Sequence, residues 1–226
     1  MNAQPTRLAG LLLAASVLLA ACGAKTDADM VKAAKSHLQN NDPKAALIEL
    51  KSALQKNPKS GEARYLLGKM LLDGGDPVAA QVELQKAADE RYNVALVVPP
   101  LARALYEQAE FKKVVDGYAK FLLPDPQAQA DLRTTVATSM ARLGQRDEAA
   151  KLVTQTLTDA PQHVAALVLK ARLAADQRDF DAANKTLADV LARDPKSSDA
   201  WMLKGDIELY GQQDRKSALA SYRKAA

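Results

Sequence analysis

The hydrophobic positions of this chain follow the spacing of amphipathic helices that are joined in pairs. In residues 61–87, Leu67 and Leu71 lie on one predicted helix, Gly75 lies in a turn, and Leu84 lies on a second helix. Side chains three or four residues apart share one face of a helix, so these leucines meet between the two helices. The two helices can approach closely because small residues line the contact: Gly68, Ala80 and Ala87. The segment therefore predicts a helical hairpin.

The same hairpin pattern recurs about every 34 residues, which is the period of tetratricopeptide repeats (TPRs). Six units are predicted, at residues 27–60, 61–94, 95–129, 130–163, 164–197 and 198–226. A proline that stops the second helix is expected at the end of four of them: Pro58, Pro126, Pro161 and Pro195. The pattern resembles TPRs over residues 27–226. This resemblance implies an all-α fold, a right-handed solenoid of antiparallel helix pairs, with an incomplete last repeat.

Two units depart from the pattern. Pro99 and Pro100 fall inside the first helix of unit three, so we expect that helix to begin near Pro99 and residues 93–98 to be irregular. Unit six stops at Ala226, within its second helix and without the polar cap that solenoids need. We expect either that the chain is a piece of a longer array or that its last helix frays unless a partner covers it.

Residues 1–21 have the composition of a secretory signal, with a basic Arg7 followed by an apolar run. The apolar run is short for a membrane span. Its end, Leu19-Ala20-Ala21-Cys22, resembles a bacterial lipobox. That resemblance implies cleavage before Cys22 and a diacylglycerol on its thiol. The alternative is an ordinary signal peptide in which the single cysteine of the chain is coincidental.

On the lipobox interpretation, residues 22–26 form a short lipidated tether. Gly23 stands where an aspartate would signal retention in the inner membrane, so the resemblance implies the outer membrane, facing the periplasm. The attached acyl chains would anchor the protein to the bilayer.

Composition argues against nucleic-acid binding and against catalysis. The formal net charge is only +4, and no basic block stands out. The two histidines, His37 and His163, fall in distant units, and no sequence spacing suits a metal, a phosphate or a nucleophile. We therefore expect no catalytic residue, no metal and no cofactor apart from the covalent lipid on Cys22.

The candidate site is the concave groove, which the first helix of each unit lines in the repeat family. One groove position is basic in four of six units, at Lys35, Lys69, Arg103 and Arg172. Nearby aromatic faces come from Tyr65, Tyr106 and Tyr210. Such a basic ladder would suit an acidic peptide or an anionic polymer.

The same positions allow a second interpretation of the ladder. Lys69, Arg103 and Arg172 each precede an acidic residue by four positions, at Asp73, Glu107 and Asp176 respectively. Each basic side chain can therefore pair along its own helix, which leaves a groove of mixed charge. The sequence does not choose between the two.

The lipobox LAAC, the segment AKSHLQNNDPKAALIELKSALQKNP and the segment GEARYLLGKMLLDGGDPVAAQVELQKA together resemble one bacterial group. This group is the TPR lipoproteins (PrsT-type) of the PEP-CTERM/exosortase system. The resemblance implies a non-catalytic envelope scaffold for protein–protein interactions in protein sorting, or in exopolysaccharide and biofilm-matrix assembly. Two alternatives remain. One is an outer-membrane TPR lipoprotein for pilus, secretin or barrel assembly, and the other is the recruiting module of a longer enzyme.

Overall fold

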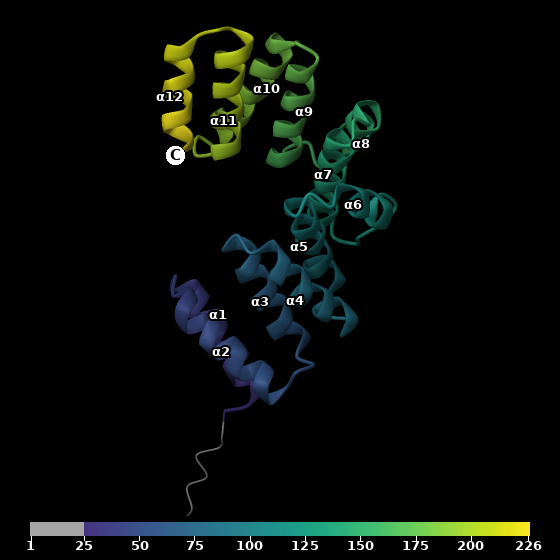
Figure 1. Ribbon diagram of the computed structural model, residues 1–226, viewed down its shortest axis with the longest axis vertical. Coiled ribbons are helices and arrows are strands. Elements are labelled where there is room, and N and C mark those ends of the chain that lie inside the picture. The colour runs from purple at the N-terminus through teal and green to yellow at the C-terminus, as the bar shows by residue number, and fades with distance from the viewer. Residues whose placement is uncertain (1–24) are drawn as a thin grey trace, which may run out of the picture.

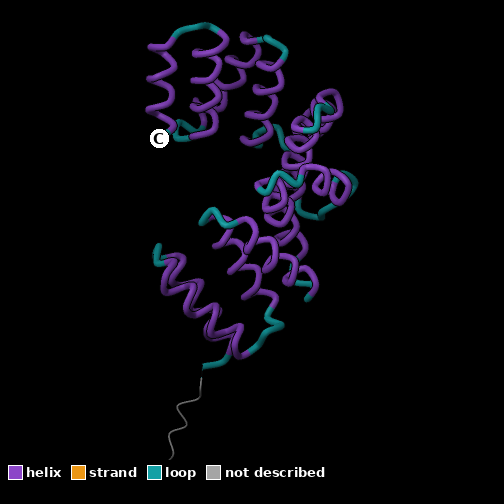
Figure 2. Tube along the Cα trace, in the orientation of Figure 1, coloured by secondary structure: helices purple, strands orange, loops and turns teal. Residues whose placement is uncertain are grey.

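The computed structural model describes residues 25–226, which form twelve α-helices in six antiparallel pairs (Figures 1 and 2). The pairs are α1 (Asp27–Gln39) with α2 (Pro43–Lys56), α3 (Gly61–Asp73) with α4 (Pro77–Asp89), α5 (Val94–Glu107) with α6 (Phe111–Tyr118), α7 (Pro126–Arg142) with α8 (Arg146–Asp159), α9 (Val164–Asp176) with α10 (Phe180–Arg193), and α11 (Ser198–Asp206) with α12 (Arg215–Ala225). These residues contain no strand. The predicted all-α array of about six repeats is confirmed.

The predicted signal peptide and Cys22 lie outside the described residues. Among residues 25–226, none of the helices combines the length and the apolar character that a membrane crossing requires.

Side-chain caps fix the starts of most helices. Thr26 and Asp29 form a capping box at α1, in which each side chain bonds to the backbone N–H of the other residue. Aspartate or serine oxygens cap other helices, including Asp42 at α2, Ser60 at α3 and Asp76 at α4. These bonds satisfy N–H groups that have no partner inside the helix.

The turn inside every hairpin passes through one residue in the left-handed conformation. The six residues, with φ from 55° to 81°, are Asn41, Gly75, Ala109, Gly144, Arg178 and Gln213. Only two of them are glycine, which adopts this conformation without a steric penalty. The shared geometry keeps the hairpins alike although the residues at this position differ.

Within each hairpin, small residues allow the two helices to pack closely. A Cβ added at Gly68 of α3 would lie 2.7 Å from Leu84 Cγ of α4, and Leu84 is fully buried. The second helices repeat this pattern with a large buried residue flanked by smaller ones, as in Ala46, Leu50 and Ala53 of α2. The interior is consequently a chain of separate small clusters along the array.

The first helices from α3 to α11 also contact one another from unit to unit. Helix α5 packs on α3 and on α7, and α9 packs on α7 and on α11. They therefore form a continuous layer, while the second helices pack on it from one side. The array bends into an arc, with α5 to α8 at its middle and the pairs α1–α2 and α11–α12 at its ends (Figure 1).

The prediction for the start of α5 is wrong. The helix begins at Val94 and continues through Pro99 and Pro100. Asn93 caps it, and its Oδ1 accepts a hydrogen bond from the Ala95 N–H at 3.1 Å. The buried residues Val97, Val98, Leu101 and Ala102 hold this segment against its neighbours. Their burial outweighs the loss of the two backbone hydrogen bonds that proline cannot donate.

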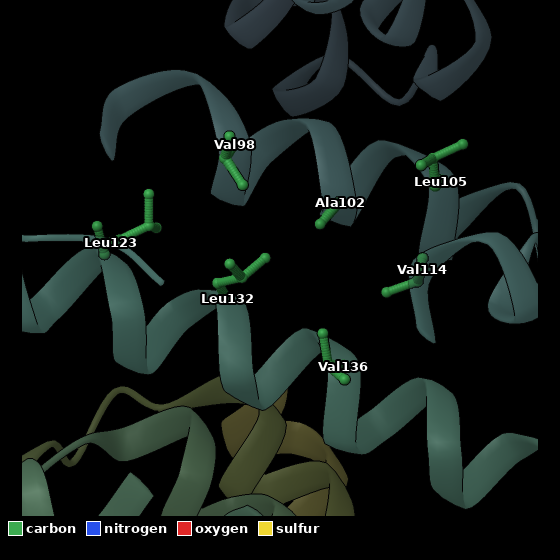
Figure 3. Packing of buried hydrophobic residues seen from close by; sticks show 8 residues of the cluster. Val98, Ala102, Leu105, Val114, Leu123, Leu132 and Val136 are labelled. Carbon is green, nitrogen blue, oxygen red and sulfur yellow. The ribbon is translucent and has the colours of Figure 1, made fainter. Parts of the chain in front are cut away.

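The predicted role of Pro126 is also wrong. Helix α6 ends at Tyr118, and Pro126 is the first residue of α7, where its missing N–H is harmless. Between the two helices, residues 119–125 replace the last turns of α6. Leu123 enters the core between α5 and α7, close to Leu132 (Figure 3).

A buried glutamine holds this irregular segment in place. Gln129 Oε1 accepts from the Leu123 N–H at 2.6 Å, and its Nε2 donates to the Phe121 carbonyl at 3.3 Å. These bonds satisfy backbone groups that a longer α6 would have paired internally. Pro58, Pro161 and Pro195 follow the ends of α2, α8 and α10, as predicted.

The close contact between α3 and α4 yields a matched pair of substitutions. We expect Gly68→Ala to lower the free energy of unfolding by about 1–2 kcal/mol, because overpacking against Leu84 exceeds the gain in helix propensity. Gly117→Ala in α6 meets nothing within 4 Å and should be neutral or stabilising by up to about 1 kcal/mol. Urea denaturation followed by circular dichroism measures both. Equal effects of the two substitutions would contradict the packing argument.

Candidate functional site

The inner face formed by the first helices contains two hollows that join at α7. The first, of about 440 Å³, lies over α3, α5 and α7, and the second, of about 660 Å³, lies over α7, α9 and α11. Both are lined by Gln127 and Asp131. Together they form one groove, here called the inner groove, across five consecutive units.

Apolar side chains occupy much of the inner groove. Leu96, Pro99 and Pro100 of α5 line the first hollow beside Tyr65 of α3. In the second hollow, Val164 and Val168 of α9 take the corresponding place. Leu96 remains 42% exposed, so apolar surface is available for a partner to cover. The prolines that depart from the helix pattern thus belong to the groove wall.

The structure pairs three of the four predicted ladder residues with acidic side chains. Lys69 Nζ lies 3.0 Å from Asp73 Oδ2 on its own helix. Arg103 lies 2.7 Å from Glu107 and also 3.5 Å from Asp73 of the preceding unit. Lys35 pairs with Glu62 of the next unit. The ladder positions are therefore largely neutralised by their neighbours, both within and between units.

Arg172 differs from the other three. It forms no ion pair within residues 25–226, and it lines a separate hollow of about 400 Å³ at the end of the array near α11. Asp176 and Asp206 line the same hollow, as does Tyr210, whose side chain is 79% exposed. This end of the inner face therefore has both charge signs and one accessible aromatic ring.

The other two predicted tyrosines lie mainly in packing contacts. The Tyr65 ring is 5.6 Å from Tyr92, and its burial raises the pKa of its hydroxyl above the ordinary value. Tyr106 packs 5.4 Å from Phe111, against the cluster around α5 and α7. Of the two, only Tyr65 lines the inner groove.

His163 is a groove residue that sequence reasoning missed. Its Nδ1 accepts the Ala166 N–H at 3.2 Å, which caps α9, and its Nε2 lies 2.8 Å from Asp131 Oδ1. Because Nδ1 accepts, the proton of the neutral ring sits on Nε2 and is donated to Asp131. The buried histidine thereby ties the start of α9 to α7 at the junction of the two hollows.

The last hairpin contains a polar network beside the Arg172 hollow. The Tyr222 hydroxyl donates to Asp206 Oδ1 at 2.8 Å, and burial together with this carboxylate raises the pKa of Tyr222 to about 12. In the π-helical turn Ile207–Gly211, the buried Glu208 accepts from Ser221 at 2.6 Å and pairs with Lys204. The network joins α11 to α12, and within it Lys204 and Glu208 neutralise each other.

Comparison with known families identifies the array. Models described as tetratricopeptide repeat match residues 31–95 and residues 140–207, which together span more than half of the chain. The chain is a tetratricopeptide-repeat protein. No curated protein matches its sequence.

Solved structures share the fold of this TPR protein at low sequence identity. Pseudomonas aeruginosa PilF has a TM-score of 0.62 at 18% identity, covering 86% of this chain and 88% of its own. PilW, described as a widely conserved type IV pilus biogenesis factor, has 0.66 at 17%, covering 86% and 90%. The Cut9–Hcn1 hetero-tetramer of the APC/C has 0.71 at 14%, covering 89% of this chain and 39% of that chain.

The titratable side chains of the TPR array do not gather into a metal site. Within residues 25–226, no group of three or more His, Cys, Asp or Glu side chains has the arrangement of a metal centre. The inner groove offers a surface along several helices that a partner can contact.

The histidine cap predicts a loss of stability that depends on the substituted side chain. We expect His163→Ala to lower the free energy of unfolding by about 1 kcal/mol or more, because α9 loses its cap. His163→Asn should retain most of the stability, since the asparagine oxygen can cap the same N–H groups. Chemical denaturation compares the two variants. Equal losses would show that the ring contributes through packing alone.

Proposed function

We propose that this TPR protein is a non-catalytic scaffold of the bacterial cell envelope that holds a segment of a partner protein in its inner groove. The observation that supports this is the groove itself, which runs over five first helices and has accessible apolar surface. A groove of this length matches an extended chain better than a small molecule. TPR families in general bind proteins and peptides, which agrees with this use of the inner face.

We further propose that Cys22 carries a lipid that anchors the protein to the outer membrane, facing the periplasm. The lipobox sequence before Cys22 supports this proposal. The tether of residues 22–26 would hold α1 close to the bilayer. The inner groove would then present itself to partners at the membrane surface.

Two assembly systems are candidates for the partner. The sequence resemblance favours PEP-CTERM protein sorting, with exopolysaccharide and biofilm-matrix assembly. The second candidate is a role in pilus, secretin or barrel assembly, and PilW, which shares the fold, is described as a type IV pilus biogenesis factor. A deletion strain separates them, because loss of exopolysaccharide supports the first candidate and loss of surface pili supports the second. A recruiting module of a longer enzyme remains a third candidate, which a catalytic domain in the same reading frame would support.

Site-specific crosslinking tests whether the inner groove is the binding surface. A photoreactive phenylalanine analogue at the exposed Ala165 in the groove should crosslink to a discrete envelope protein in living cells. The same analogue at the exposed Asp189 of α10, which lines none of the hollows described here, is the matched control. Crosslinks of equal yield at both positions would contradict binding in the groove.

The lipid anchor predicts a change in membrane partition. We expect Cys22→Ser to leave the protein as an uncleaved precursor or in the soluble fraction, because no acyl chain can be attached. Membrane fractionation and mass spectrometry of the processed N-terminus measure this. Processed protein that still partitions fully into membranes would refute lipidation at Cys22.

A further inference from the structure

The charged side chains that line the inner groove are mostly acidic. Its two hollows contain the carboxylates of Asp125, Asp131 and Asp199 and one ammonium group, that of Lys69. This ammonium group is already paired with Asp73 at 3.0 Å. The groove therefore has the opposite sign to the one that the basic ladder predicts.

The three carboxylates differ in how far they are already engaged. Asp125 caps α7, with its Oδ1 accepting from the Ala128 N–H at 2.7 Å. Asp131 Oδ1 accepts from His163 Nε2 at 2.8 Å and from Gln127 Nε2 at 3.4 Å, and no lysine or arginine pairs with it within residues 25–226. Asp199 in the first turn of α11 is exposed and has no ion pair in that same range. Asp131 and Asp199 are thus available to a cation from outside.

The acidic and apolar parts of the inner groove alternate along its length. Leu96 and Pro99 lie in the first hollow, Asp131 lies at the junction, Val164 and Val168 follow, and Asp199 closes the second hollow. Two basic residues of the ladder, Lys35 and Arg103, would repel a cationic partner only weakly, because each forms an ion pair with an acidic neighbour. Charge complementarity therefore favours a positively charged partner. The apolar surface of the groove would be buried when such a partner binds.

We propose that the occupant of the inner groove is an extended protein segment in which lysine or arginine alternates with apolar side chains. Its cations pair with Asp131 and Asp199, and its apolar residues cover Leu96, Pro99 and Val164. This inference rests on the proposed function of the groove and adds the chemistry of its ligand. It replaces the acidic ligand that the basic ladder suggests.

The test uses three synthetic fluorescent peptides of equal length with the same apolar framework. They carry lysine, glutamine or glutamate at the intervening positions. Fluorescence anisotropy with the complete protein should show the lysine peptide binding at least about fivefold more tightly than the glutamate peptide, because two exposed ion pairs contribute modestly. The difference should shrink as salt screens the charges.

Two matched variants assign the preference to the groove. Asp131→Asn with Asp199→Asn should remove the lysine preference, and the asparagine oxygen at position 131 can still accept from His163. Glu148→Gln with Asp189→Asn removes the same charge from the exposed faces of α8 and α10 and should leave the preference intact.

The outcomes separate this inference from the function on which it rests. Peptides that all bind with equal affinity, or a preference for glutamate, would overturn the cationic ligand while leaving a peptide-binding groove. A lysine preference that survives the groove variants or disappears in the control variants would place the recognition elsewhere and overturn the inference. Absence of binding by all three peptides, together with no crosslinking from Ala165, would overturn the groove function itself.

Discussion

The close approach of two helices inside each hairpin is the contact on which the rest of the array depends. At the contact of Gly68 with Leu84, and again at that of Gly205 with Tyr222, an added Cβ would collide with the opposite helix. This contact fixes how each first helix lies on its second helix. The first helices can then stack on one another, and the face that they leave free becomes the inner groove. The inner groove therefore results from the same helix contacts that stabilise each hairpin.

Much of this fold was predictable because it follows from the spacing of residues that are close together in the sequence. Leucine and alanine recur with helical periodicity, aspartate or serine begins helices, and proline follows three of the second helices. The two errors, at Pro99 and Pro126, arose where tertiary packing determines where a helix begins or ends. Burial around Val98 and Leu101 holds a helix together across its prolines, and Gln129 stabilises a segment whose own sequence favours no regular structure.

The repeat pattern predicted a groove on the first helices, but of the predicted groove residues only Lys69 and Tyr65 line the inner groove, and the charge of the groove was not predicted. Sequence spacing shows only partners on the same helix, whereas Lys35 pairs with Glu62 and Arg103 with Asp73 across units. The cap formed by His163 was missed because histidine is not a usual capping residue. A signal did exist, since His163 stands directly before a first helix, as Ser60 does.

The left-handed residue in each turn has a consequence for the local stability of the hairpin tips. Ala109, Arg178 and Gln213 hold a conformation that glycine would adopt more cheaply, whereas Gly75 and Gly144 adopt it freely. The array tolerates this local cost because stabilising contacts elsewhere in each repeat compensate for it. The tips of these three hairpins therefore store backbone strain that a glycine at the same position would relieve.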